Sequence, residues 1–187
     1  MLLAMSECEL QTRPMYRQEY EALGALGFFD DENVELLDGQ VVLAAEEGPD
    51  HGAVYRRLNR ILIEGVPAGE GEIAVGNPLS LSSLSSPQPD FMVVPPSDAY
   101  RLAHPTSASL VVEVSNASRR LDLGFKAVLY AAAGIPEYWV VDLVRNEIVV
   151  HRDPAVKTWK SVTRYRDGVV RALRHPDVAV DVKALLR

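Results

Sequence analysis

Two short apolar runs separated by one helix-length segment place the strongest constraint on the fold of this chain. The runs are LVVEVS at residues 110–115 and EYWVVDL at residues 137–143, and both have the length and composition of buried strands. Between them lies a predicted helix with an apolar stripe that should face the core, formed by Leu121, Phe125, Val128, Leu129 and Ala132. Asp122, Lys126 and Tyr130, spaced by four, form a second row beside this stripe, and the helix ends at Gly134 and Pro136. A strand–helix–strand unit of this kind predicts two parallel neighbouring strands joined by a right-handed crossover.

The flanking segments predict antiparallel elements around this unit. The run VELLDGQVVLA, residues 34–44, has two apolar stretches around Asp38-Gly39, which is typical of a tight hairpin. Other expected elements are helices over residues 14–26, 51–64 (capped by Asp50) and 181–186, and strands over residues 91–94, 147–151 and 158–165, the last two joined at Asp153-Pro154. We therefore expect an α/β fold, a mixed β-sheet flanked by helices, in a single domain over residues 14–187 after a flexible N-terminus of residues 1–13.

Composition and charge exclude several classes of protein. In a chain of 187 residues, 48% apolar content supports a real core, and a net charge of −7 argues against a general nucleic-acid coat protein. A nuclease stays compatible, because a metal site itself collects carboxylates. The single cysteine, Cys8, excludes an internal disulfide and a cysteine-based zinc cluster. The opening MLLAM is too short for a signal peptide and no run reaches membrane-spanning length, so we expect a cytoplasmic protein with no membrane association.

Two acidic residues and a lysine stand out in the central stretch. Asp90 opens the strand 91–94, Glu113 lies inside LVVEVS, and Lys126 follows on the helix. A charged residue in a buried strand is costly unless it is paired or metal-bound, and carboxylates are the ligands that Mg²⁺ or Mn²⁺ prefers. These residues predict a metal-dependent phosphodiesterase site, in which Asp90 and Glu113 bind the ion. Each residue also has a structural interpretation. Asp90 could be an ordinary turn residue, Glu113 could be solvated on an edge strand, and Lys126 could form a surface ion pair with Asp122.

Neighbouring polar residues are candidates for substrate contacts. The histidine could instead cap its own helix, and the tyrosine could be an ordinary boundary residue. Arginines at 119 and 120 lie in the loop between Glu113 and Lys126, so they would be near any bound nucleic acid, whereas Arg56, Arg57 and Arg60 are better explained by solvated faces. The candidates are His51, Ser115, Arg119, Arg120, Asp122 and Tyr130. Tyr138 and Trp139, in a predicted strand, are expected in the core.

The order of these motifs carries a family resemblance. PDFMVV followed by EVS looks like the PD-(D/E)XK nuclease signature, and VVEVSNASRRLDLGFKAVLYAAAGIPEYWVVD resembles the Uma-type family of restriction-endonuclease-like proteins, over about residues 14–185. The resemblance implies a restriction-endonuclease-like fold and an Mg²⁺-dependent nuclease. It implies that Asp90 and Glu113 are the metal-binding acids, that Lys126 is the signature lysine moved from strand to helix, and that Glu35 is an additional upstream acid. Ser115 stands where the standard signature has lysine.

Three functions compete at this point. The first is a metal-dependent DNA endonuclease, expected to form a homodimer because symmetric pairs are the commonest assembly. The second is a non-catalytic binding or assembly module of the same fold, favoured by Ser115 and by the acidic net charge. The third is metal-free hydrolysis of glycosides by two carboxylates, disfavoured because only 7% of the chain is aromatic.

Overall fold

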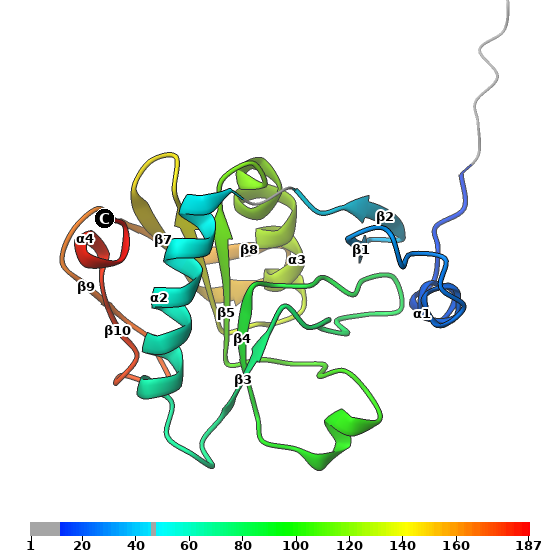
Figure 1. Ribbon diagram of the computed structural model, residues 1–187, viewed down its shortest axis with the longest axis horizontal. Helices are drawn as coiled ribbons and strands as arrows, with labels where there is room; N and C mark the ends of the chain where they lie inside the picture. The colour runs from blue at the N-terminus through cyan, green and yellow to red at the C-terminus, as the bar shows by residue number, and fades with distance from the viewer. Residues whose placement is uncertain (1–11, 46–47) are drawn as a thin grey trace, which may run out of the picture.

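A six-stranded mixed sheet forms the centre of the computed structural model, which describes residues 12–45 and 48–187 (Figure 1). Its strands run in the order β3-β4-β5-β6-β7-β8. Their bounds are β3 Glu72–Val75, β4 Phe91–Val94, β5 Leu110–Ser115, β6 Glu137–Asp142, β7 Glu147–Ala155 and β8 Thr158–Tyr165. β5 and β6 pair in parallel, with Glu113 opposite Val140, and the other neighbours in the sheet pair antiparallel. The expected parallel pair and mixed sheet are confirmed.

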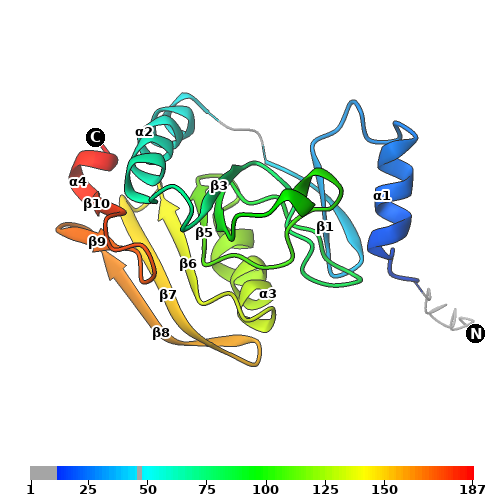
Figure 2. The same ribbon diagram turned by 90° about the horizontal axis from the view of Figure 1, so that it is seen from below.

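Helices cover both faces of this sheet (Figure 2). On one face lie α2 (Pro49–Gly65), the small sheet of β9 (Val169–Arg171) and β10 (Ala179–Asp181), and α4 (Val182–Leu185). On the other face lie a π-helical turn, η2 (Leu121–Lys126), and α3 (Ala127–Ala132). The alternation of side chains along β5 separates the two cores, because Val112 and Val114 face α2 whereas Val111 faces α3.

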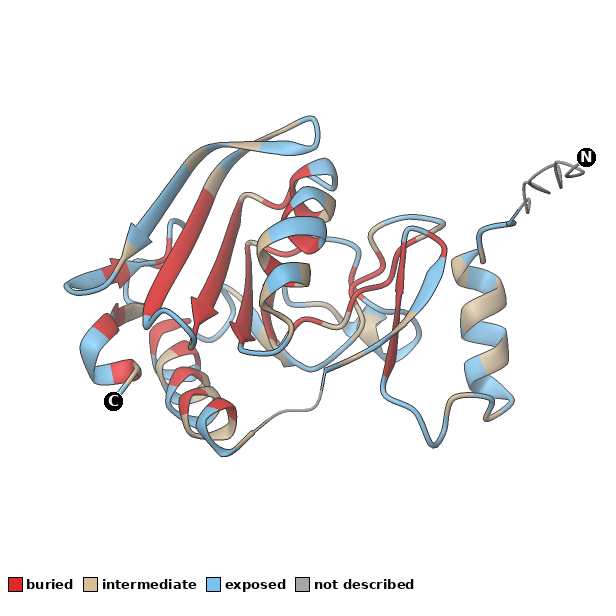
Figure 3. Cartoon of the chain, turned by 90° about the horizontal axis from the view of Figure 1, so that it is seen from above, coloured by how far each residue is buried: buried red, intermediate tan, exposed pale blue. Residues whose placement is uncertain are grey.

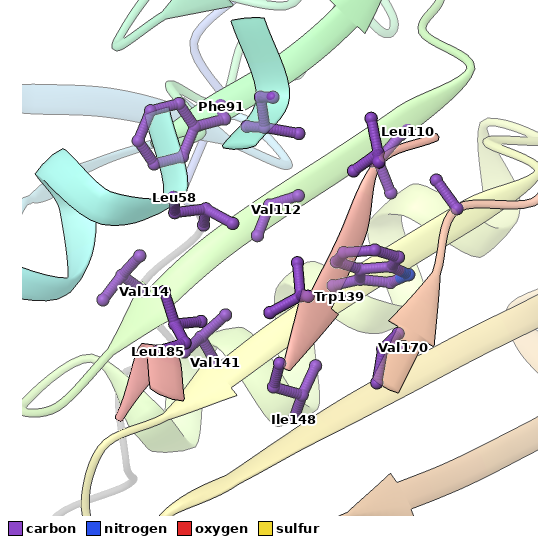
Figure 4. Close-up of a cluster of buried hydrophobic side chains, with 14 of the residues drawn as sticks. Leu58, Phe91, Leu110, Val112, Val114, Trp139, Val141, Ile148, Val170 and Leu185 are labelled. Atoms are coloured by element: carbon purple, nitrogen blue, oxygen red, sulfur yellow. The ribbon is translucent and has the colours of Figure 1, made fainter. Parts of the chain in front are cut away.

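The larger core cluster joins α2 to the sheet. Leu58 of α2 packs against the face that carries Val112, Val141 and Trp139 (Figure 4). The colours of Figure 3 show the same pattern, with buried residues concentrated on the central strands and on the inner side of α2. Trp139 and Tyr138 are fully buried, as expected from their place in a central strand.

A hairpin and a helix lie beside the main sheet, at the right of Figure 1. The hairpin consists of β1 (Val34–Leu37) and β2 (Gln40–Leu43), and both residues of its turn, Asp38 and Gly39, have positive φ, which confirms a primed turn. α1 (Arg17–Ala25) has no buried residue, and a 3₁₀ turn, η1 (Asp98–Arg101), follows β4. Leu36 bridges to Ser86, so the hairpin is tied to the loop that leads into β4.

Two predicted boundaries differ in the structure. Helix α2 begins at Pro49 with Gly48 as its N-cap, because proline suits the first helical position; Asp50 lies inside the first turn, where its charge complements the helix dipole. The turn between β7 and β8 falls at residues 156–157 instead of Asp153-Pro154. Lys157, the second residue of this turn, has positive φ, and Pro154 stays in the strand opposite Trp159.

The predicted face of the helix over residues 121–132 was wrong. Phe125 and Val128, which belong to the apolar stripe, are 44% and 42% exposed, whereas Asp122, Lys126 and Tyr130 are buried. The row of Asp122, Lys126 and Tyr130 faces inward because the carboxylates of Glu35 on β1 and Glu113 on β5 lie on that side and bind Lys126. The helix begins as a π-turn, in which residues four apart are nearly eclipsed, so Asp122 and Lys126 project to the same side.

The predictions for the N-terminus concern residues that the structure leaves undescribed. Residues 1–11, which contain Cys8 and most of the expected flexible N-terminus, lie outside the described residues. In the described part of the chain, no helix combines the length and the apolar character needed to cross a membrane.

Candidate active site

The ammonium of Lys126 lies between carboxylates from three separate elements. Its Nζ atom is 3.0 Å from Glu35 Oε1 of β1, 3.0 Å from Glu113 Oε1 of β5, and 3.9 Å from Asp122 Oδ1 of η2. Burial alone would lower the pKa of Lys126, but the attraction of Glu113, Glu35 and Asp122 outweighs it and raises this pKa. Lys126 is therefore a buried, permanently charged group, although it is only 5% exposed.

Glu113 is the centre of this network. Its Oε1 accepts hydrogen bonds from Lys126 and from the Tyr130 hydroxyl at 3.1 Å, and its Oε2 accepts one from the Asp90 backbone N–H at 3.3 Å. Burial raises the pKa of Glu113 well above its ordinary value; Lys126 opposes the rise, and the charges of Asp122, Asp90 and Glu35 add to it. Acidic groups at this site therefore outnumber the one lysine ammonium.

Asp90 faces the same pocket from the start of β4. Its Oδ2 accepts a hydrogen bond from the Val114 backbone N–H at 2.6 Å and lies 3.4 Å from Nε2 of His51 on α2. The antiparallel pairing of β4 with β5 brings Asp90 beside the strand that carries Glu113. The two acids that the sequence singles out thus lie at one end of adjacent strands.

Asp122 is held by two serines and forms part of the pocket wall. Its Oδ2 accepts hydrogen bonds from Ser115 Oγ at 2.7 Å and from Ser118 Oγ at 2.5 Å, and its backbone carbonyl accepts one from the Tyr138 hydroxyl at 3.1 Å. Burial raises the pKa of Asp122, and Lys126 opposes that rise. Ser115, in the position of the standard signature lysine, contacts this acid instead of the pocket.

These groups line a pocket of about 580 Å³. Arg120 also lines it, together with Arg56 of α2, which sequence reasoning assigned to a solvated face. Arg119, expected near a substrate, instead donates from Nε to Asp142 Oδ2 at 2.6 Å, because the fully buried carboxylate at the end of β6 needs a cation. Ser115 and Tyr130 are fully buried behind Asp122 and Glu113, so they act on the pocket through those acids.

Sequence reasoning missed three groups that hold the site. The Gln88 backbone N–H donates to Glu35 Oε2 at 3.0 Å, which fixes the hairpin acid against the loop before β4. Ser118 and Tyr138 hold Asp122, as described above. Gln88 lies in a serine- and proline-rich loop without periodicity, so no pattern in the sequence could have identified it.

The donor chemistry of the pocket fits a hard divalent cation. Glu35, Glu113 and Asp122 lie around Lys126, and Asp90 lines the same pocket. Carboxylate oxygens are the preferred ligands of Mg²⁺ and Mn²⁺. Within residues 12–45 and 48–187, no group of three or more His, Cys, Asp or Glu side chains is arranged to hold a metal ion. One or two carboxylates plus water satisfy Mg²⁺, and Asp90 and Glu113, at one end of adjacent strands, are a pair that could hold it.

The fold and the pocket together define a restriction-endonuclease-like α/β protein. Residues 17–181 match the Uma2 family, described as "Putative restriction endonuclease", and the chain belongs to this family. Its fold is similar to that of a protein from Anabaena variabilis ATCC 29413, described as "a putative nuclease belonging to DUF820", with a TM-score of 0.75 and 15% sequence identity over 92% of this chain and 98% of that chain. None of the curated proteins compared with this chain matches it.

Proposed function

We propose that this protein is a divalent-metal-dependent endonuclease that hydrolyses phosphodiester bonds in DNA, with a site of the PD-(D/E)XK type. The observation that carries the proposal is the meeting of Lys126 with Glu35 and Glu113, beside Asp90, in one pocket. These four residues come from distant parts of the chain, and a fold has no packing reason to bury so many charges together.

Asp90 and Glu113 would hold the cation, Mg²⁺ or Mn²⁺. Bound there, the cation neutralises phosphate charge and lowers the pKa of water. Lys126 orients the attacking water or offsets the charge that develops on the phosphate, and Glu35 holds its ammonium in place. Arg120 and Arg56, on the pocket wall, provide cations for the flanking phosphates.

Cleavage of supercoiled plasmid and single-stranded DNA with Mn²⁺ or Mg²⁺ tests the proposal. Glu113→Gln keeps the shape of the side chain but removes its charge, and we expect cleavage to fall by about a hundredfold or more. The matched control is Asp167→Asn, which removes one negative charge from a side chain that is 75% exposed. Equal cleavage by wild type and Glu113→Gln would contradict the proposal.

A non-catalytic module of the same fold is the second candidate. It is favoured by Ser115, which turns away from the pocket toward Asp122, and by the lack of three preformed metal ligands in the described chain. Binding of DNA that needs neither metal nor Glu113, without cleavage, would establish it. We also propose a cytoplasmic homodimer, as expected from the sequence; sedimentation velocity checks the dimer, and cell fractionation checks the compartment.

A further inference from the structure

The two oxygens of the Asp122 carboxylate are in very different situations. Oδ2 accepts two short hydrogen bonds, from Ser115 and Ser118. Oδ1 is buried without a hydrogen-bond partner in the described part of the chain, and it points toward Lys126 Nζ at 3.9 Å. A buried carboxylate oxygen without a hydrogen-bond partner costs stability. The contacts of Asp122 in this structure do not explain why its Oδ1 is buried.

Lys126 and a divalent cation would both lie against the carboxylate of Glu113. Oε1 already accepts from Lys126 Nζ at 3.0 Å and from the Tyr130 hydroxyl, whereas Oε2, on the side of Asp90, has one longer contact and is the oxygen more open to a cation. An ammonium that keeps its place at Oε1 repels a divalent cation bound to the same carboxylate. Lys126 is buried among the groups described above, so a short movement to another acceptor is open to it, whereas withdrawal into solvent is not.

We infer that Asp122 is a positioning residue that accepts the ammonium of Lys126 when Glu113 binds a divalent cation. The inference rests on the proposed function. Asp122 Oδ1 is the remaining carboxylate oxygen beside Nζ, and it is already aligned, because Ser115 and Ser118 hold the other oxygen. Lys126 stays anchored to Glu35 during the movement, at 3.0 Å.

This role also explains the serine that replaces the signature lysine. Ser115 lies on the same strand face as Glu113 and donates a hydrogen bond to Asp122. Asp122 itself lies in the π-turn, four residues before Lys126. A lysine moved from strand to helix needs a second acceptor at its new location. Ser115 supplies the hydrogen bond that fixes this acceptor, and it does so from the position that the lysine vacated.

A double-mutant cycle on Mn²⁺ affinity tests the inference in the full chain. Free Mn²⁺ is measured by electron paramagnetic resonance for wild type, Asp122→Asn, Lys126→Met and the double variant. We expect Asp122→Asn to weaken Mn²⁺ binding about tenfold when Lys126 is present, because the ammonium then stays on Glu113, and by at most about threefold in the Lys126→Met background. Lys126→Met alone should bind Mn²⁺ more tightly than wild type.

The other outcomes separate this inference from the proposed function. An equal loss from Asp122→Asn in both backgrounds means that Asp122 acts through its charge alone, and it overturns the inference while the nuclease proposal stands. No Mn²⁺ binding by wild type overturns both. Ser115→Ala covers the case in which the Lys126 variant does not fold: a weakening in the same direction as for Asp122→Asn supports the inference, and an unchanged affinity overturns it. Asp167→Asn is the charge control.

Discussion

Replacement of Lys126 by methionine should destabilise the fold, and more strongly at high pH. The variant keeps most of the side-chain volume but leaves Glu35, Glu113 and Asp122 without their shared cation. At an effective dielectric constant of about 20, each 3.0 Å contact represents about 5 kcal/mol of attraction, much of which desolvation of the ammonium offsets. Loss of one partner of a buried pair costs about 3–5 kcal/mol, so we expect a decrease of that size in the free energy of unfolding at pH 8.

The pH dependence follows from Glu113. Burial holds its pKa above the ordinary value in the folded state, and removal of Lys126 takes away the main influence that lowers it. A carboxyl group with a raised folded pKa favours folding fully below its unfolded pKa, near 4.5, and this contribution is lost as the pH rises through the folded pKa. The variant should therefore be closer to wild type at pH 5 than at pH 8.

Urea unfolding followed by circular dichroism at the two pH values measures this difference. Lys160→Met, at an exposed position of β8, is the matched control and should change stability by at most about 0.5 kcal/mol. A Lys126→Met variant as stable as wild type at pH 8, or one with the same loss at pH 5, would refute the argument that a buried cation balances these acids.

Three further predictions concern other buried residues of the fold. Burial lowers the pKa of His151 to about 4, so the folded protein binds this proton less readily than the unfolded chain. The wild type should therefore lose about 3 kcal/mol of stability through His151 between pH 7 and pH 4. The variant His151→Gln should not show this loss in an acid titration of stability. Tyr130→Phe removes a hydrogen bond to Glu113 and should cost about 1–2 kcal/mol in urea unfolding. Gly65→Ala places a methyl group 2.7 Å from the backbone of Val178 and should lower stability by about 1–3 kcal/mol in a thermal melt.

Matched results set the limits of these three predictions. Gly52→Ala adds a methyl group whose nearest neighbour is the flexible end of Arg56, and it should change stability much less than Gly65→Ala. An identical acid titration of wild type and His151→Gln would show that the histidine is not held neutral by burial. Full stability of Tyr130→Phe would mean that water replaces the hydroxyl at Glu113.

The sequence alone predicted the elements whose burial is set by local pattern. The runs at β4, β5 and β6 read as strands because most of their residues are apolar, many of them valine, and all three strands are buried on both faces. The Asp38-Gly39 pair predicted the hairpin, because its turn needs positive φ at both positions. The residues that meet at the pocket were identified from acids in apolar strands and from the family resemblance.

Tertiary structure decided which face of the helix over residues 121–132 is buried. Its apolar stripe predicted that Phe125 and Val128 face the core, yet Lys126 and Asp122 are buried there instead. That outcome depends on Glu35, which arrives from a hairpin 91 positions earlier in the chain and is tied by the Gln88 N–H. The spacing of apolar residues predicts which face of a helix prefers an apolar core over water. It cannot predict a buried ion pair, because the partner charge comes from a distant part of the chain.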